Sequence, residues 1–361
     1  MKILFVGGGS VGHIAPSKAV WEECKQLIPD AEAHFVCSPR PDDAKFLQSN
    51  DLAFSILDAP RAPALRSPKD VVGSLLFPFK FVSAVKRAKK ILEEQNPNLI
   101  FSKGSYVSLP LCFAAKKKKI PIIAHDSDAV SGYANKIVAK WANHICTGFP
   151  SKSYKLIANS YTGNPIRKEI TEGSKEEGLR ITGFDGSKPI LLVIGGSQGA
   201  KALNEAITNQ LDDLLIRCDI IHITGRKKLH ITENLSPTTD HYYRTEFANE
   251  ELAHFYAAAD LALSRAGANS IADLAANGIP TILVPLRNVG HDHQYKNVLV
   301  AKKHGCIHLE QSTLPEKLLP TVHGLIADKE KRQNMSASIQ KFGKPDAALQ
   351  IAKIIAQTLD S

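Results

Sequence analysis

The chain has 361 residues, of which 43% are hydrophobic and 22% charged, and this balance excludes a disordered polypeptide. The formal net charge is +9, and no apolar stretch approaches the roughly 18 residues that a membrane-spanning helix needs. The six cysteines are scattered without a Cys-x-x-Cys pair, which favours reduced core thiols over a zinc site or a disulfide framework.

The first predicted elements are a buried strand at residues 3–6, a glycine turn and a helix. The apolar run is too short for a signal peptide, and "GGGSVGH" at residues 7–13 follows it directly. A strand, a glycine turn and a helix start let backbone N–H groups approach an anion closely. Gly7, Gly9 and Gly12 match the dinucleotide fingerprint, but the strand at 33–40 ends without the expected acidic residue. An NADP site remains an alternative because Arg40 could suit that cofactor. A glycine turn that serves packing alone is the other alternative.

Residues 61–90 carry most of the surplus charge, with eight basic residues and one acid. Four apolar residues recur there at helical spacing: Val71, Leu75, Phe79 and Val82. Six basic residues surround them: Lys69, Lys80, Lys86, Arg87, Lys89 and Lys90. Apolar surface ringed by lysine predicts contact with an anionic membrane, and Pro78 should kink or restart the helix. A core-facing helix with a solvated basic side is the alternative. Nucleic acid is disfavoured because no aromatic stacking platform is interleaved with the charges.

Two segments of the chain echo each other. "LIFSKGSYVSLPLCFAAKKKKIPIIAHDS" begins at Leu99 and "LALSRAGANSIADLAANGIPTILVPLRN" at Leu261. Each has an apolar strand, a serine followed by a basic residue, a glycine, a helix, an Ile-Pro step and a second strand. Apolar strands that alternate with helices are typical of parallel α/β sheets, so we predict two Rossmann-like domains with a joint near residues 163–165. A helical pattern over 345–359 predicts a final helix that packs back on the first domain.

The second domain has its own glycine-rich turns. "GGSQGA" at 195–200 follows a buried strand and predicts a diphosphate site, in which Ser197 caps the helix. "SRAGANSIADLAANGIP" at 264–280 adds a second helix start, with Asp273 placed to accept hydrogen bonds from a ribose diol or to be a solvated helix-face acid. "GHDHQYKN" at 290–297 gathers polar residues after a strand. His291, Asp292 and His293 lack a distant further ligand, so a metal site is disfavoured there.

The ordered set of motifs resembles the MurG family, bacterial transferases that move N-acetylglucosamine from UDP to lipid I and so form lipid II. Nearly the whole chain takes part, with "GGGSVGH", "GSYVSLP", "IPIIAHDSDAVSGYANK", "GNPIR", "GGSQGA", "TEF", "SRAGANSIADLAANGIP" and "DHQYKN" in family order. The resemblance implies the GT-B fold, two Rossmann-like α/β domains that face a central cleft. An acceptor and membrane domain would cover 1–163 with a helix at 341–361, and a UDP-sugar domain would cover 164–340.

The same resemblance implies an inverting displacement that needs no metal or other cofactor. The enzyme would be peripheral on the cytoplasmic face of the inner membrane, where other cell-wall synthesis proteins are possible partners. Its substrates would be UDP-N-acetylglucosamine and a polyprenyl-diphosphate acceptor, lipid I.

Site residues follow from the resemblance at matching positions. In the donor domain, the expected substrate-binding residues are Arg167, Ser197, Gln198, Ala248, Arg265, Ala268, Asn269, Ser270, Ile271, Ala272, Asp273, His293 and Gln294. Ser197 would bind the diphosphate and Arg167 would reach the donor. The 268–273 run would hold uracil and ribose, with Ala248 against the base, and His293 and Gln294 would hold the sugar hydroxyls. In the acceptor domain, Ser10, Val11, Gly12 and Asp128 would bind the acceptor, and His13 and Asp126 would be catalytic.

The chain departs from the family pattern at the acceptor. Val11 replaces a glycine of the family turn, and a β-branched residue there would resist positive φ and crowd a phosphate. The family's His-Glu-Gln-Asn reads His125-Asp126-Ser127-Asp128 here. Asp128 offers a carboxylate where an amide could donate hydrogen bonds.

Two choices stay open from the residues alone. His13, whose ordinary pKa is near 6.5, suits the role of base, but it could donate to the acceptor's phosphate instead, and Asp126 is the rival base. A different glycolipid acceptor, a UDP-sugar epimerase and a non-catalytic UDP-sugar-binding scaffold on the membrane are the alternative functions.

Overall fold

The structure, a computed structural model, describes residues 1–61, 68–150, 154, 157–196, 199–225, 238–288 and 292–360, with the backbone alone for 68–74 and 238–239. The chain divides into two compact units, Met1–Arg167 with Asp346–Ser361 (unit 1) and Lys168–Pro345 (unit 2). The expected joint at 163–165 thus lies inside unit 1. Asn164 accounts for this, because its buried side chain donates a 2.9 Å hydrogen bond to the Ser127 carbonyl of the same unit.

Unit 1 is built on a seven-stranded parallel sheet, in the order β3-β2-β1-β4-β5-β6-β7 across its described residues. Its strands are β1 (Lys2–Val6), β2 (Glu32–Cys37), β3 (Phe54–Ile56), β4 (Leu99–Ser102), β5 (Ile122–Asp126), β6 (His144–Thr147) and β7 (Asn159–Tyr161). Its helices are η1 (Val11–His13), α1 (Ala15–Leu27), α2 (Pro41–Gln48), α3 (Pro68–Gln95), α4 (Ser108–Lys117), α5 (Tyr133–Val138) and α14 (Ala347–Leu359). The strand order reverses between β1 and β4, and such a switch point is where parallel sheets bind ligands.

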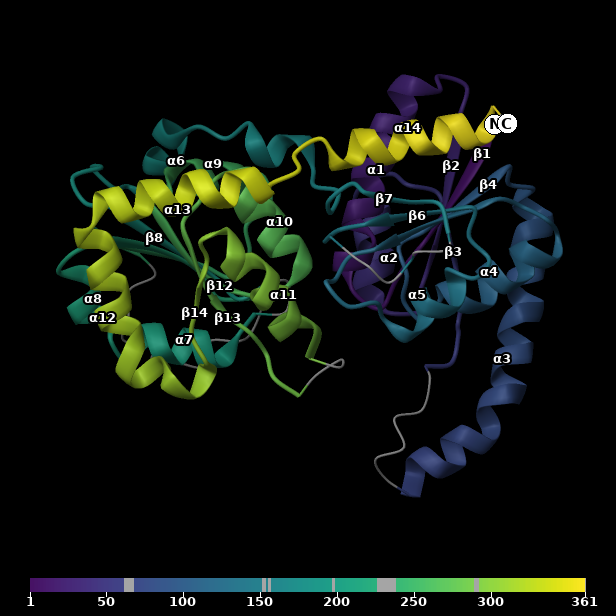
Figure 1. Ribbon diagram of the computed structural model, residues 1–361, viewed down its shortest axis with the longest axis horizontal. Coiled ribbons are helices and arrows are strands. Elements are labelled where there is room, and N and C mark those ends of the chain that lie inside the picture. Colours follow the sequence, from purple (N-terminus) through teal and green to yellow (C-terminus); the bar gives the residue numbers. More distant parts are fainter. Residues whose placement is uncertain are drawn as a thin grey trace. The chain divides into compact units, whose positions relative to one another are not determined.

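Helix α14 returns from unit 2 to pack on α1, beside which it runs in Figure 1. Ile351 and Ile355 of α14 are fully buried in one core cluster with Val20 and Trp21 of α1. Their spacing of four residues places both on one helix face. Unit 1 is therefore completed by a segment far from it in sequence.

Helix α3 is one helix from Pro68 to Gln95 with Pro78 inside it, so of the expected kink or restart at Pro78 the restart is wrong. Pro78 is exposed, and water can take the place of the hydrogen-bond donor that proline lacks. The second half of α3 packs into the core through Ala88, Ile91 and Leu92. The first half extends beyond the sheet (Figure 1).

Unit 2 repeats the plan of unit 1, with the order β10-β11-β9-β8-β12-β13-β14 and one antiparallel pair, β10 with β11, in its described part. Its strands are β8 (Ile190–Ile194), β9 (Asp219–Ile223), β10 (Thr238–Thr239), β11 (Tyr242–Thr245), β12 (Leu261–Arg265), β13 (Thr281–Val284) and β14 (Ile307–His308). Its helices are η2 (Lys168–Thr171), α6 (Lys175–Thr182), α7 (Lys201–Thr208), α8 (Leu211–Leu215), α9 (Glu251–Ala258), α10 (Ala268–Ala276), α11 (His293–Ala301), η4 (Lys302–His304), η5 (Gln311–Thr313), α12 (Leu314–Ala327) and α13 (Lys329–Phe342).

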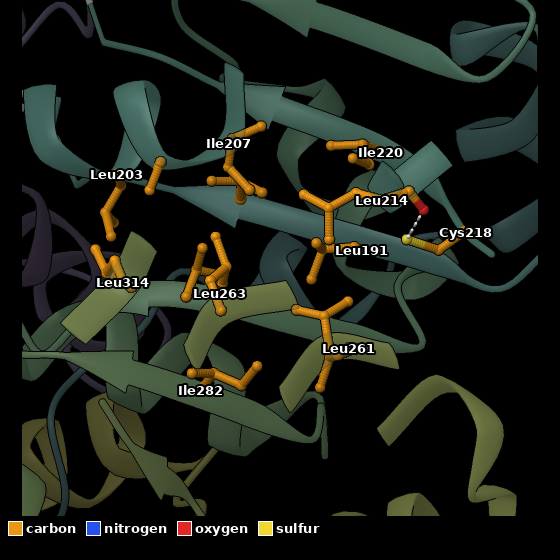
Figure 2. Packing of buried hydrophobic residues seen from close by; sticks show 14 of the residues in the cluster. Leu191, Leu203, Ile207, Leu214, Cys218, Ile220, Leu261, Leu263, Ile282 and Leu314 are labelled. Carbon is orange, nitrogen blue, oxygen red and sulfur yellow. Dashed lines mark hydrogen bonds between the residues drawn. The ribbon is translucent and has the colours of Figure 1, made fainter. Parts of the chain in front are cut away.

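The core of unit 2 forms where helix faces meet the central strands. Figure 2 shows Leu191, Leu263 and Ile282 of three adjacent strands interleaved with Leu203 and Ile207 of α7. All these side chains are fully buried, as expected for a parallel sheet covered by helices. The prediction of two Rossmann-like α/β domains is confirmed.

The structure also tests two expectations drawn from the composition, one on the cysteines and one on membrane-spanning helices. All six cysteines, each within the described ranges, are buried and unpaired, as predicted for core thiols. Among the residues that the structure describes, no helix combines the length and the hydrophobicity needed to span a bilayer.

Candidate active site

The glycine turn of unit 1 follows β1 and is held by residues from β2 and α2. Gly9 has a φ of +88°, which glycine adopts readily. Its N–H donates to Oδ2 of Asp43 at 2.7 Å, and Arg40 Nη1 donates to its carbonyl at 2.8 Å. The Gly9 amide is thus already bound to a carboxylate of the chain. An incoming diphosphate at this turn has to use the neighbours of Gly9.

Val11 fits the turn without strain, which corrects the expectation that it resists the required backbone. It opens the 3-10 turn η1 and does not have a positive φ. Only Gly9 in this loop takes the left-handed conformation. The helix α1 begins at Ala15, and His13 ends the 3-10 turn directly before it.

His13 lies against the backbone of the glycine turn. A Cβ atom at Gly7 would lie 2.7 Å from the His13 carbonyl oxygen, so only glycine fits there. The residue is partly exposed, but its Nδ1 atom is buried and has no hydrogen-bond partner among the described residues. Burial lowers the pKa of His13, and the nearby Lys103 ammonium lowers it further, whereas Asp128 and Asp43 act in the opposite direction. The imidazole is therefore neutral at pH 7 and able to accept a proton.

The other expected catalytic residue, Asp126, ends β5 and is almost fully buried. Asn135 Nδ2 donates to its Oδ1 at 2.9 Å, and Tyr154 Oη donates to its Oδ2 at 2.7 Å. Tyr154 also bonds Ser131 Oγ at 2.8 Å. Both carboxylate oxygens are engaged within unit 1. This arrangement suits a residue that positions the 126–135 loop.

Lys103 is a residue of this site that the sequence reasoning did not select. It follows β4, and only 1% of its surface is exposed. Its Nζ lies 2.9 Å from Nδ1 of His125 and is hydrogen-bonded to Ser127 Oγ. Burial lowers the pKa of Lys103 to about 7, although the charges of Asp128 and Asp126 act to raise it. The signal in the sequence was the serine and basic residue that recur in both halves of the chain.

The glycine turn of unit 2 follows β8 in the same way. Gly196 and Gly199 have φ values of +80° and +67°, and the Gly199 N–H donates to the Gly196 carbonyl at 2.9 Å. Ser197 and Gln198, expected at the donor diphosphate, lie outside the described residues, as does His291. Helix α7 starts at Lys201, directly after the turn.

Helix α10 carries the expected uracil and ribose residues, 268–273. Its N-cap Gly267 is extended, and Ala268 and Ile271 are buried, so they could meet a ligand only through their backbone. Asn269, Ser270 and Ala272 are partly exposed. Asp273 is partly exposed one turn further along, 3.5 Å from Tyr256 Oη.

Three residues expected to bind the sugar donor are held within unit 2, two by hydrogen bonds and one by burial. Arg265 is buried and donates to the Val284 carbonyl at 3.2 Å and to Gln311 Oε1 at 2.7 Å. Gln294 Oε1 accepts a 2.9 Å hydrogen bond from the Leu286 N–H. Ala248 is buried in the core cluster around β8 and α9. His293 begins α11 and is partly exposed.

Comparison with known proteins places this geometry in a family. Residues 3–147 match the family model of the glycosyltransferase family 28 N-terminal domain, and residues 190–351 match that of its C-terminal domain. A Clostridium botulinum (strain Loch Maree / Type A3) protein is 38% identical over 323 residues, which are 88% of this chain and 88% of that protein. It is named UDP-N-acetylglucosamine–N-acetylmuramyl-(pentapeptide) pyrophosphoryl-undecaprenol N-acetylglucosamine transferase.

Solved structures agree on the fold. MurG of Acinetobacter baumannii superposes with a TM-score of 0.75 over 99% of both chains, at 23% identity. The chain belongs to the MurG family. A UDP-N-acetylglucosamine 2-epimerase of Neisseria meningitidis shares the fold at a TM-score of 0.62 and 15% identity, with 99% of both chains covered. The MurG family membership rests on the sequence relatives, whereas the fold alone is common to both enzyme classes.

As a MurG family member, the chain is a glycosyltransferase, and the resemblance seen in its motifs is confirmed. The expected acceptor residues Ser10, Val11, Gly12, His13, Asp126 and Asp128 all belong to unit 1, and the described donor residues belong to unit 2 except Arg167. Arg167 is the last residue of the first stretch of unit 1.

Proposed function

We propose that this MurG family member transfers N-acetylglucosamine from UDP-N-acetylglucosamine to the 4-hydroxyl of the N-acetylmuramyl group of lipid I, forming lipid II with inversion. The observation that carries the proposal is the position of His13, whose pKa burial lowers, beside a glycine turn at the β1/β4 switch point. The relative named for this reaction supports it at 38% identity over 88% of the chain.

In the proposed reaction His13 is the base. As the acceptor oxygen attacks the anomeric carbon, its proton passes to the His13 imidazole, and the bond from that carbon to the UDP oxygen breaks. The electron pair of that bond leaves with UDP. A positioned base of this kind contributes about 10²- to 10⁴-fold to the rate.

The leaving diphosphate is stabilised by unit 2. The glycine turn after β8 and the first turn of α7 present backbone N–H groups, and the helix dipole favours negative charge there. Asp273 accepts hydrogen bonds from the ribose hydroxyls. One preorganised donor to developing charge is worth about 3 kcal/mol of barrier.

A transfer assay tests the reaction. Purified protein is given radiolabelled UDP-N-acetylglucosamine with a short-chain lipid I, and other glycolipids are offered in parallel. Label in the lipid I product alone supports the proposal. Label only in another glycolipid would show that this other glycolipid is the acceptor. Conversion of the donor to UDP-N-acetylmannosamine, with no transfer, would instead indicate an epimerase.

The donor site is tested separately by binding of UDP. Asp273→Ala should weaken UDP affinity by about tenfold or more, because a charge-assisted hydrogen bond is worth about 1.5–3 kcal/mol. Asp212→Ala, which removes an exposed acid elsewhere on unit 2, is the matched control. Equal affinity for UDP in both variants contradicts the ribose assignment.

We also propose that the enzyme is peripheral and meets the anionic inner face of the membrane through α3. Leu75 and Phe79 are 70% and 75% exposed, and Leu76 and Val82 are exposed on the same segment. Lone exposed apolar residues are ordinary, but a cluster on a protruding helix is a candidate contact surface. Val71 and Lys69, also expected on this surface, have side chains outside the described set.

The basic fringe of α3 is partly neutralised within unit 1. Three of its cations lie within 4 Å of acids: Arg87 with Asp58 at 3.8 Å, Lys89 with Glu93 at 3.6 Å and Lys90 with Glu94 at 3.7 Å. Lys80 and Lys86, nearer to the apolar cluster, make no ion pair with any described residue. Each cation near an anionic surface adds about 1 kcal/mol.

Vesicle flotation tests the surface. Wild-type protein should float with vesicles that contain phosphatidylglycerol more than with pure phosphatidylcholine, and Phe79→Ser should reduce flotation severalfold. Ile216→Ser, at a residue 68% exposed on unit 2, is the matched control. Equal flotation of Phe79→Ser and wild type would reject α3 as the contact.

A further inference from the structure

Lys103 directly follows β4, at the end of its pairing with β1 in the middle of the unit 1 sheet. Ser102 of β4 pairs with Val6 of β1, and the Lys103 N–H donates to the Val6 carbonyl at 2.9 Å. Lys103 therefore lies beside Gly7, the first residue of the glycine turn. A Cβ atom at Gly7 would lie 3.4 Å from Lys103 Cβ and 2.7 Å from the His13 carbonyl. Lys103 and His13 thus flank the same glycine.

The ammonium group of Lys103 joins three segments that meet at this point. It contacts His125 Nδ1 at 2.9 Å, Ser127 Oγ, and Asn164 Oδ1 at 3.5 Å. His125 Nε2 lies 2.9 Å from the Gly163 carbonyl, to which it donates, so its Nδ1 is the acceptor for Lys103. Lysine side chains are almost never fully buried unless polar partners hold the ammonium group, and Lys103 has three such partners.

Unit 2 has a cation at the equivalent place. Arg265 ends β12, the strand next to β8, as Lys103 follows β4 next to β1. Arg265 is also buried and ties β13 and Gln311 together. In both units a buried cation therefore lies next to the glycine turn, but among the described residues only Lys103 has a neutral histidine at hydrogen-bond distance.

We propose that Lys103 is a positioning residue of the transfer reaction, which holds the 125–128 segment in place and sets the charge around the His13 imidazole. The proposal rests on the proposed role of His13. Removal of the ammonium group leaves the carboxylates of Asp128 and Asp43 as the charges that act on His13, and both favour its protonation. Around Lys103 itself the titratable groups are His125, Asp126, Asp128 and Cys146. Without Lys103, His13 should hold its proton more tightly.

The direct test follows the titration of His13 by NMR with ¹³C-labelled histidine, the resonance being assigned with His13→Gln. In Lys103→Met the His13 midpoint should move upward toward pH 6.5. Lys103→Arg, which keeps the charge, should leave the midpoint low. Lys140→Met, an exposed lysine of unit 1, is the control for loss of one charge. A folded Lys103→Met protein with an unchanged His13 midpoint overturns the proposal.

The second readout is the pH profile of kcat/KM. An ordinary histidine is only about one quarter neutral at pH 6. The ratio of the rate at pH 6 to that at pH 8 should therefore fall in Lys103→Met, by at most about fourfold because burial still acts on His13. A merely structural lysine would lower both rates equally, which contradicts the proposal. If wild type does not act on lipid I, the proposed function fails, yet the NMR titration still decides the role of Lys103. Should Lys103→Met fail to fold, a wild-type His13 resonance without a second inflection near pH 7, where Lys103 loses its proton, overturns the proposal.

Discussion

Tyr154 Oη donates a 2.7 Å hydrogen bond to Oδ2 of Asp126. Because Asn135 binds the other oxygen, an asparagine at position 126 can keep one acceptor toward Asn135 and turn its amide to the tyrosine oxygen. The loop should therefore survive Asp126→Asn.

The first prediction compares the two candidate bases. We expect Asp126→Asn to reduce kcat about tenfold or less, and His13→Asn to reduce it about 10²- to 10⁴-fold, the range for loss of a positioned base. Steady-state transfer rates at pH 8 measure both. A loss in folded Asp126→Asn as large as that of His13→Asn would make Asp126 the base.

The second prediction concerns acid stability and His222, which is buried between Asn204 Oδ1 at 3.0 Å and Tyr242 Oη at 2.9 Å. Burial lowers the pKa of His222 to about 3. Below pH 6.5 the unfolded chain therefore binds a proton that the folded chain does not. The free energy of unfolding should fall by about 1.4 kcal/mol per pH unit more in wild type than in His222→Gln between pH 6 and 4. Urea titrations across this range measure the difference, and parallel slopes contradict it.

The third prediction uses alkaline stability and needs no activity. Burial lowers the pKa of Lys103 to about 7, so between pH 7 and 10 the unfolded chain holds a proton that the folded chain has lost. Wild type should gain stability over Lys103→Met by up to about 1.4 kcal/mol for each pH unit in this window. Urea unfolding at pH 7, 8 and 9 measures the gain. A constant difference would show that Lys103 keeps an ordinary affinity for its proton.

The fourth prediction concerns backbone strain at Ser105, which has a φ of +80° and a buried Oγ atom without a partner among the described residues. Ser105→Gly should stabilise the protein by about 1 kcal/mol, because glycine adopts this conformation without strain. Its neighbour Gly104 is the contrast, because its φ is +87° and a Cβ atom there would lie only 2.7 Å from Asn135 Oδ1. Gly104→Ala should lower the melting temperature. A lower melting temperature for Ser105→Gly contradicts the argument.

The fifth prediction concerns α14. Ile351 is fully buried against α1, so Ile351→Ala should cost about 2–5 kcal/mol of stability. Lys353→Ala, on the exposed side of the same helix, should cost less than about 0.5 kcal/mol. Denaturant unfolding gives both values, and equal costs would place the α14 contact outside the stable core.

The sequence was sufficient for the fold because periodicity reports burial directly. Strands such as Ile190–Ile194 are fully apolar and followed by glycine, and the repeated Ser-basic-Gly pattern located the equivalent turns of both units. Local chemistry was harder to predict. The bond from Gly9 to Asp43 joins residues from different elements, and no spacing rule connects them.

Lys103 shows why part of the site was missed. The residue was visible as one of a matched pair of cations, but lysine is normally exposed, so its burial among His125, Ser127 and Asn164 depends on segments brought together only by folding. The continuation of α3 through Pro78 was missed for the opposite reason, because it depends on exposure to solvent and not on burial. A local rule predicted a kink or a restart, but Pro78 is exposed, so water can satisfy the carbonyl that lacks a partner and the helix continues.

The return of α14 to unit 1 has a consequence for synthesis. A ribosome that has translated residues 1–167 has not yet made the helix that covers Val20 and Trp21, whereas residues 168–345 are contiguous. Unit 2 can therefore fold while the nascent chain still exposes the apolar residues of α1. Completion of unit 1 is in this way delayed until unit 2 has been made, and transiently exposed apolar surface of this kind favours aggregation during that interval.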